Sequence, residues 1–465
     1  MRQAFEQYFR SLDMHDNFRL SGRLSEDEGF FSFGKDAVCF GRSATGFRAR
    51  KPSDPLYDVA RDSRVQGDDV EIAFDPDQVI KNLRFEHYAN ALPARSRGFS
   101  RGLIRSAYYV ARPLLPVKVR KHLQKFHLNG WRNLAFPKWP VDTTVDTLHE
   151  ELLALAIRSR GGEAVPFVWF WPEGANACAV MTHDVETELG VQLSDYIMDT
   201  DQAFEIPASF QIVPEERYNV TVAYLNGLRQ RGFEINIQGL NHDGHLFSTK
   251  EGFKAKVAKI NRYGRDYKAL GFRSPILYRN QDWYEFFDFD YDTSVPNVGH
   301  LDPQRGGCCT VMPYFVGNLV ELPVTLTQDY SLFHILNDYS LTLWEQPVDL
   351  ILNKHGLINA IVHPDYLIGA RERETFQGLL ALYSRLRQHK NVWIALPKDV
   401  SSWWRRRSKM QPVYRDGHWE IEGPGCEQAR PAFASLDGDR LVYSIVLPGG
   451  DISRFSSQRE HASAI

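Results

Sequence analysis

The chain has 465 residues, of which 43% are apolar and 13% aromatic, enough for a large core but too many for one ordinary compact domain. A net charge of −3 and a pI near 6.6 argue against a nucleic-acid binder that grips phosphates. The five cysteines are scattered and lack CxxC spacing, which indicates neither a disulfide framework nor a cysteine zinc site. We therefore expect two or three structural units and no nucleic-acid partner.

The N-terminal region predicts an extension over residues 1–135. Its opening sequence, MRQAFEQYFRSLDMHDNFRL, lacks the apolar core of a secretion signal, and no stretch approaches the roughly 18 apolar residues of a membrane span. These features predict a cytoplasmic, bacterial-type protein. Residues 101–132 are basic and amphipathic, which indicates either a membrane-surface segment or a helix pair packed on the neighbouring domain. Pro113 and Pro116 interrupt this segment and favour the helix pair.

Residues 136–400 alternate between apolar strands and helical patterns. Strands are expected at 177–184, 208–213, 233–238, 269–272, 289–292, 319–322, 358–362 and 392–396. Helices are expected at 147–159, 218–230, 250–263, 343–355 and 375–388. Alternation of this kind predicts an α/β fold with a parallel sheet, and seven or eight units predict a barrel. Residues 401–465 contain two further strand patterns and predict a small C-terminal β appendage.

Catalytic side chains of a βα barrel lie just past the carboxyl ends of its strands. The strand at 177–184 runs into THDVE, and alternation places Asp184 and Glu186 on the same side of an extended chain. Two such carboxylates can have different roles: one binds a metal, and the other takes a proton from water. An acidic loop that caps a helix is the equally weighted alternative.

The next strand end carries QGLNHDGH, in which His242 and His245 are close enough in sequence to share a metal. The alternative is a pair of solvent-exposed loop histidines. GFRSP then ends a strand at Arg273, which can orient a carboxylate or form an ordinary surface ion pair.

Later strand ends carry DYDTS, VELP and IVHPDY. We expect Asp292 and Glu321 to line the substrate side of the site or to anchor it structurally. His363 directly precedes a proline and is suited to act as a general acid, with a buried structural histidine as the alternative. Trp283 is expected to stack on a sugar ring, although most aromatic residues in this region belong to the core.

Taken together, the order of carboxylate pair, His loop, Arg-x-Pro, Asp, Glu-x-Pro and His-Pro resembles the polysaccharide deacetylase family of carbohydrate esterases (NodB homology). The resemblance covers residues 169–398 and is nearest to a bacterial subgroup with a long N-terminal extension. It implies a distorted (β/α)7-type barrel and a metal-dependent hydrolase that removes N-acetyl or related acyl groups from a sugar or polysaccharide.

The resemblance also implies roles for individual residues. Asp184 corresponds to the catalytic base, Arg273 to the residue that orients it, and His363 to the general acid. Glu186 and His242 correspond to metal ligands. Zinc is the metal that the family implies, with cobalt or manganese as alternatives, and the implied partner is an N-acetylated glycan.

One position departs from the family pattern. The first histidine of the expected His-x-x-x-His pair is Gln238, whose carbonyl oxygen suits hard cations better than zinc. His245 is the alternative ligand. Two further readings therefore stay open: a degenerate barrel that binds glycan without cleaving it, and a glycoside hydrolase that pairs Asp184 or Glu186 with Glu321. The sequence leaves open whether the chain forms a homo-oligomer.

Overall fold

The computed structural model describes residues 3–11, 18–92, 128, 130–416 and 418–446. Most of the basic segment predicted at 101–132 lies outside these ranges, so its two readings stay predictions. Within the described ranges, no helix combines the length and apolarity that crossing a lipid bilayer requires.

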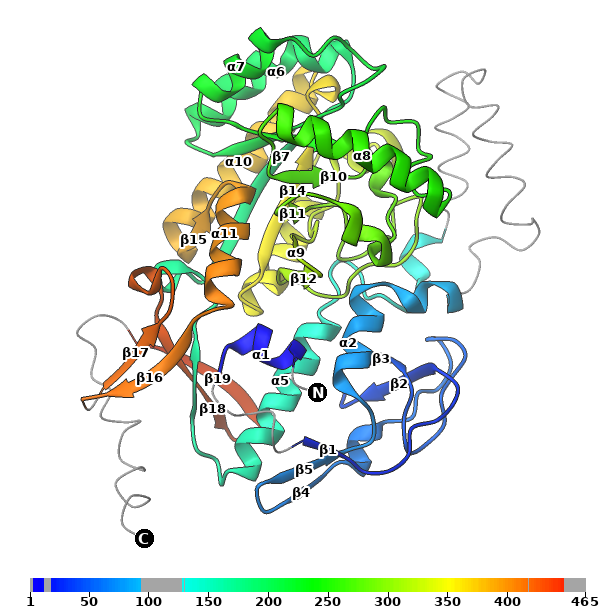
Figure 1. Ribbon diagram of the computed structural model, residues 1–465, viewed down its shortest axis with the longest axis vertical. Helices are drawn as coiled ribbons and strands as arrows, with labels where there is room; N and C mark the ends of the chain where they lie inside the picture. The colour runs from blue at the N-terminus through cyan, green and yellow to red at the C-terminus, as the bar shows by residue number, and fades with distance from the viewer. Residues whose placement is uncertain (1–2, 12–17, 93–127, 129, 417, 447–465) are drawn as a thin grey trace.

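The upper part of the molecule in Figure 1 is a curled sheet surrounded by helices. Its strands run in the order β12-β13-β11-β10-β9-β8-β7-β14, and β15 pairs with the first residues of β7. All these pairs are parallel except the β12–β13 hairpin. The strands are β7 (Ala177–Val185), β8 (Ala208–Ile212), β9 (Glu234–Gln238), β10 (Gly271–Arg273), β11 (Tyr291–Asp292), β12 (Tyr314–Val316), β13 (Leu319–Glu321), β14 (Leu357–Val362) and β15 (Val392–Ile394).

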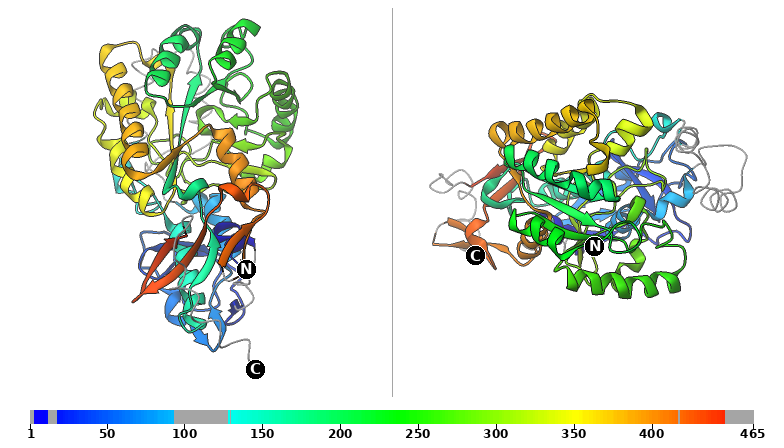
Figure 2. Two further views of the ribbon diagram at one scale, coloured as in Figure 1. Left: turned by 90° about the vertical axis from the view of Figure 1, so that its left-hand side faces the viewer. Right: turned by 90° about the horizontal axis from the view of Figure 1, so that it is seen from above.

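The helices that follow these strands cover the outside of the sheet, as the view from above in Figure 2 shows. They are α6 (Glu188–Ala203), α7 (Val222–Gln230), α8 (Lys250–Asp266), α9 (Thr342–Asn353), α10 (Ala370–Lys390) and α11 (Pro397–Arg407). β7 lies inside this ring, and all nine of its residues are buried, in agreement with the apolar run that predicted it.

An extended segment after β13 brings the two ends of the sheet together. The backbone N–H groups of Thr325 and Leu326 donate to the carbonyl oxygen of Asn359 on β14, at 3.3 and 3.1 Å. The Thr325 hydroxyl donates to the carbonyl of Leu357, at 2.8 Å. Few bonds join the sheet here, so the ring is irregular. The predicted distorted barrel with its N-terminal and C-terminal additions is confirmed.

The lower part of the molecule combines both ends of the chain (Figure 1). Helix α5 packs against strands of the extension and against β18 of the appendage. β18 also pairs with β6, which directly precedes the barrel. The elements are α1 (Gln3–Phe9), β1 (Phe18–Leu20), β2 (Gly29–Phe33), β3 (Ala37–Gly41), β4 (Arg64–Gln66), β5 (Asp69–Ile72), α2 (Pro76–Arg84), α5 (Thr144–Ser159), β6 (Val165–Val168), β16 (Gln411–Arg415), β17 (His418–Glu422), β18 (Pro431–Asp437) and β19 (Arg440–Ile445).

One hydrophobic core joins these elements. It contains Phe31 from the extension, Val145 from α5, Trp403 from α11 and Ala432 from the appendage. The core therefore crosses both of the boundaries predicted at 135/136 and 400/401. The division of the chain at those two points stays a prediction.

Candidate active site

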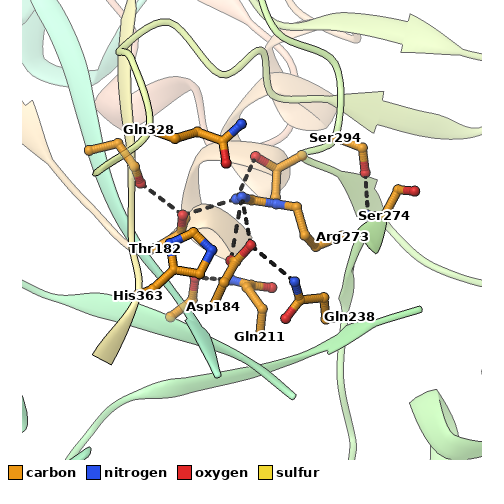
Figure 3. Close-up of polar contacts among 12 residues, drawn as sticks. Thr182, Asp184, Gln211, Gln238, Arg273, Ser274, Ser294, Gln328 and His363 are labelled. Carbon is orange, nitrogen blue, oxygen red and sulfur yellow. Dashed lines mark hydrogen bonds and ion pairs between the residues drawn. The ribbon is translucent and has the colours of Figure 1, made fainter. Parts of the chain in front are cut away.

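Strand pairing gathers the predicted catalytic residues at the carboxyl edge of the sheet. Gln238, the last residue of β9, lies directly opposite Arg273, the last residue of β10. On β7, Asp184 lies opposite Gln211 of β8. His363 directly follows β14, whose last residue pairs with the one before Asp184. Figure 3 shows the side chains of Asp184, Gln238, Arg273 and His363 turned toward one another.

Glu186 contacts three other residues of this cluster. Its Oε1 lies 2.8 Å from His242 Nε2 and 3.5 Å from His363 Nε2, and it accepts a 2.9 Å hydrogen bond from Gln238 Nε2. The Glu186 side chain is 15% exposed, whereas those of His242 and His363 are 7% and 5% exposed. Glu186 is thus the member of the cluster most open to an incoming molecule.

Arg273 lies behind Asp184. Its Nη1 lies 3.4 Å from each Asp184 oxygen, and its Nη2 donates to the Thr182 hydroxyl at 2.9 Å. Arg273 is fully buried, so bulk water does not screen its charge. The guanidinium therefore holds the Asp184 carboxylate in position, and a part for this contact in catalysis stays a prediction.

His363 is held from behind by Asp329. The imidazole Nδ1 lies 2.6 Å from Asp329 Oδ1, and the His363 backbone N–H donates to the other oxygen at 2.6 Å. Burial alone would lower the pKa of His363, but Asp329 and then Glu186 outweigh it and raise this pKa well above its ordinary value. The ring is consequently cationic near neutral pH and can donate a proton through Nε2.

The two carboxylates of THDVE have opposite pKa shifts. Burial raises the pKa of Asp184, although Arg273 and His363 partly oppose it. Burial would also raise the pKa of Glu186, but His242 and His363 outweigh it and hold this pKa well below the ordinary range. Glu186 is therefore ionised around neutral pH, while Asp184 has the higher proton affinity that suits a base.

The loop after β9 has a constrained backbone. His242 has a φ of +55°, in the left-handed region that side chains other than glycine seldom adopt. At Gly239 (φ +61°), an added Cβ would lie 2.4 Å from Cγ of Pro275. Since Pro275 follows Arg273 by two residues, this contact packs the two catalytic loops against each other.

Several residues of the site escaped the sequence analysis. Asp329 lies 34 residues before His363, in a short helical segment that continues into Ser331–Leu336, and it does not directly follow a predicted strand, so no local pattern marks it. Thr293, which lies 3.4 Å from Arg273 Nη2, follows β11 and was not singled out within DYDTS. Asp365 belongs to the HPDY string; burial raises its pKa to about 6, and neighbouring His363 opposes that rise.

Asp292 and Glu321 lie deeper than expected. Both are fully buried on adjacent parallel strands. Asp292 accepts from Ser294, and Glu321 accepts from the backbone N–H of Val295. Burial and the neighbouring Asp292 raise the pKa of Glu321 well above its ordinary value. Their burial and hydrogen bonds are those of structural anchors, and contact of either carboxyl with a substrate stays a prediction. The glycoside hydrolase reading would need Glu321, and its burial does not favour that reading.

The other peripheral candidates separate from the cluster. Trp283 is half-buried against Phe253, with ring centroids 5.5 Å apart, and its stacking on a sugar stays a prediction. His245 is exposed on the loop beyond the buried His242, so the alternative metal ligand lies outside the buried group.

The residues present fit a divalent cation. Single ligand atoms of Asp184, Glu186 and His363 all lie within 4.8 Å of one another, and ligands around one ion lie about 3–5 Å apart. Two buried oxygens, Asp184 Oδ1 and Gln238 Oε1, accept no hydrogen bond from the described residues. A cation would satisfy such acceptors. Of the predicted ligands, this trio contains Glu186 alone; His242 and Gln238 both lie within hydrogen-bond distance of Glu186, and their role as ligands stays a prediction.

Neither a family model nor a curated protein matches the sequence. About half of the chain is similar in structure to polysaccharide deacetylases. A putative polysaccharide deacetylase from Mycobacterium smegmatis is 18% identical over 51% of this chain and 93% of its own, with a TM-score of 0.41. A putative polysaccharide deacetylase involved in O-antigen biosynthesis from Bordetella bronchiseptica is 17% identical over 50% and 85%, with a TM-score of 0.30. Puue allantoinase is 14% identical over 50% and 92%, with a TM-score of 0.38.

Proposed function

We propose that this chain is a hydrolase that removes an N-acetyl or related N-acyl group from a sugar, with a divalent cation as cofactor. One observation carries the proposal. Asp184, a buried carboxylate held by Arg273, lies within ligand distance of Glu186 and of His363, an imidazole held cationic by Asp329. A base, an anionic ligand and an acid are the groups that amide hydrolysis needs.

Asp184 would take a proton from the attacking water as that water adds to the amide carbonyl carbon. Its raised pKa makes it a stronger base than a surface aspartate, and Arg273 keeps the carboxylate in position. Proton transfer to a positioned base contributes roughly 10²–10⁴-fold to a rate.

His363 would then give its Nε2 proton to the amine that leaves when the carbon–nitrogen bond breaks. Asp329 holds the other ring nitrogen, which fixes the direction of Nε2 and stabilises the charged ring. The reaction consumes one water molecule, and its products are a carboxylate and a free amino sugar.

Glu186, His242 and Gln238 would hold the cation. A divalent ion bound there supplies Lewis acidity, which polarises the amide carbonyl and stabilises developing negative charge. Glu186 stays anionic because its pKa is held low, so it is available as a ligand over the whole neutral range.

The choice of an N-acylated sugar rests on the motif order that the sequence shares with polysaccharide deacetylases. A barrel that binds glycan without cleaving it is the second candidate, and Gln238 in place of a ligand histidine is the observation that favours it.

The test measures acetate and free amine released from N-acetylated mono- and oligosaccharides with added Mn²⁺, Co²⁺ or Zn²⁺. We expect activity that falls at least about 100-fold in Asp184→Asn and in His363→Ala. Glycan binding without any acetate release would favour the non-catalytic barrel. Release that persists unchanged in both variants would refute the proposed mechanism.

A further inference from the structure

Gln238 makes an unusual bridge between two carboxylates. Its side-chain nitrogen donates to Asp184 Oδ2 at 3.2 Å and to Glu186 Oε1 at 2.9 Å. One amide nitrogen carries two N–H donors, so a single neutral group can serve both acids. Gln238 is 1% exposed, and its hydrogen bonds therefore compete little with water.

The other end of the same amide is an unsatisfied acceptor. Gln238 Oε1 is buried and accepts no hydrogen bond from the residues that the structure describes. Leaving such an oxygen without a partner costs about 1–3 kcal/mol. A half-turn about the last side-chain torsion would exchange oxygen and nitrogen, which have nearly the same size. The oxygen would then face Asp184 and Glu186, an arrangement that is favourable only with a cation among the three.

A histidine at this position behaves differently. A neutral imidazole nitrogen either donates one hydrogen bond or offers one lone pair, so it cannot bridge two carboxylates from a single atom. An imidazole ligand also favours zinc, whereas amide and carboxylate oxygens favour harder ions such as Mn²⁺ and Mg²⁺.

We propose that Gln238 makes this a site for an exchangeable, oxygen-preferring divalent cation of the Mn²⁺ class, in contrast to tightly held zinc. In this scheme the Gln238 oxygen is a ligand when the ion is bound, and the Gln238 amide group bridges Asp184 and Glu186 when it is not. The inference rests on the cation site of the proposed function, but it concerns binding of the ion and not turnover.

The experiment measures cation binding to the full-length chain after treatment with EDTA, in the absence of sugar. Free Mn²⁺ is followed by electron paramagnetic resonance, and Zn²⁺ by competition with a chromophoric chelator. Gln238→His and Gln238→Leu are compared with the wild type. Gln281→Leu serves as the matched control, because Gln281 is equally buried but bonds to Arg84 and Tyr314.

We expect about one Mn²⁺ per chain and a loss of Mn²⁺ affinity of at least about tenfold in Gln238→Leu, with no change in Gln281→Leu. Gln238→His should raise the ratio of Zn²⁺ to Mn²⁺ affinity at least about tenfold. If Gln238→Leu does not fold, the ratio in Gln238→His decides alone. Equal ratios in wild type and Gln238→His would overturn the inference, as would a wild-type chain that binds no divalent ion.

The outcome is separable from that of the proposed function. Cation binding through Gln238 without acetate release would leave this inference standing and refute the hydrolase. Acetate release, together with the same ratio of Zn²⁺ to Mn²⁺ affinity in Gln238→His as in wild type, would support the hydrolase and refute this inference.

Discussion

The two ends of the barrel bury charge in different ways. At the carboxyl end, Asp184 faces Arg273 and His363 faces Asp329, so charges are balanced by opposite charges. At the other end, the guanidinium of Arg407 is equally buried but donates to backbone carbonyls of Tyr8, Val168 and Trp169. Burial and then the charge of Arg10 lower the pKa of Arg407 to about 9, and no carboxylate of the described residues pairs with its guanidinium.

This difference separates residues with a chemical role from residues that only stabilise the fold. Paired charges at the carboxyl end shift each other's pKa values, and two acceptor oxygens there receive no hydrogen bond from the part of the chain that the structure describes. Arg407 instead ties α1, β6 and α11 together through fixed carbonyls. We infer that substitutions at the carboxyl end change activity as well as the free energy of unfolding, whereas substitutions around Arg407 change the free energy of unfolding alone.

The largest expected effect is on activity. Asp184→Asn and His363→Ala should each lower kcat/KM by roughly 10²–10⁴-fold, because each removes a proton-transfer group. Each variant also leaves a buried charge without its partner, that of Arg273 in Asp184→Asn and that of Asp329 in His363→Ala, so each should lower the free energy of unfolding by about 3 kcal/mol or more. Urea unfolding of both variants is therefore measured beside their activity, under conditions where both are folded. If either variant loses activity only because it unfolds, the proposed difference between the carboxyl end and the surroundings of Arg407 is wrong.

Arg407→Met should lower the free energy of unfolding by about 3 kcal/mol or more. The substitution leaves three buried carbonyl oxygens without their donor, at about 1 kcal/mol or more each. The matched control is Arg406→Met, since Arg406 is only half-buried and bonds to the side chain of Gln428. Equal losses in the two variants would contradict the role given to Arg407.

Glu234 is a buried carboxylate whose hydrogen bonds with the described residues come from uncharged groups. It accepts from the Tyr291 hydroxyl and from the backbone N–H of Lys398, and burial raises its pKa to about 7. A raised pKa means that the folded state prefers the protonated carboxyl. The stability contributed by Glu234 is thus complete below pH 4.5 and lost as pH rises through about 7.

Glu234→Gln should therefore gain stability relative to wild type between pH 5 and 8, by at most about 3 kcal/mol. The measurement is the urea midpoint of both proteins at the two pH values. A difference that stays constant with pH would show that Glu234 is ionised in the folded protein.

The smallest expected effect concerns the packing of the two catalytic loops. Gly239→Ala should cost about 2 kcal/mol or more, because its Cβ meets the Pro275 ring in a left-handed backbone conformation. Gly438→Ala is the matched control, with the same φ of +61° and no atom within 4 Å of the added Cβ, and it should cost about 1 kcal/mol. If kcat falls in Gly239→Ala and not in Gly438→Ala, the contact with Pro275 also affects the position of Arg273.

Much of the barrel was predictable because its strands are continuous apolar runs and its catalytic groups follow them directly. The strand expected at 177–184 is β7, and the helix expected at 250–263 lies within α8. Helix α6 was missed although Thr187 caps it by accepting from the backbone N–H of Gly190. Its sixteen residues include four acids, which weaken the apolar periodicity that marks a helix.

The tertiary partners were not predictable. Asp329 reaches His363 only because the chain after β13 returns to close the barrel, and no spacing in the sequence encodes that contact. The burial of Asp292 and Glu321 also depends on neighbouring strands, since both residues follow the same strand-end pattern as Asp184. A position at the end of a strand therefore predicts that a residue lies at the edge of the sheet, but it does not predict how deeply the side chain is buried.

The most direct test of the account is hydrolysis of an N-acetylated sugar in water enriched in ¹⁸O. Attack of water on the amide carbon, assisted by Asp184, predicts one ¹⁸O atom in each acetate released and none at the anomeric carbon of the sugar beyond ordinary exchange. Unlabelled acetate, or label fixed at a newly cleaved anomeric carbon, would contradict the assignment of these residues to amide hydrolysis.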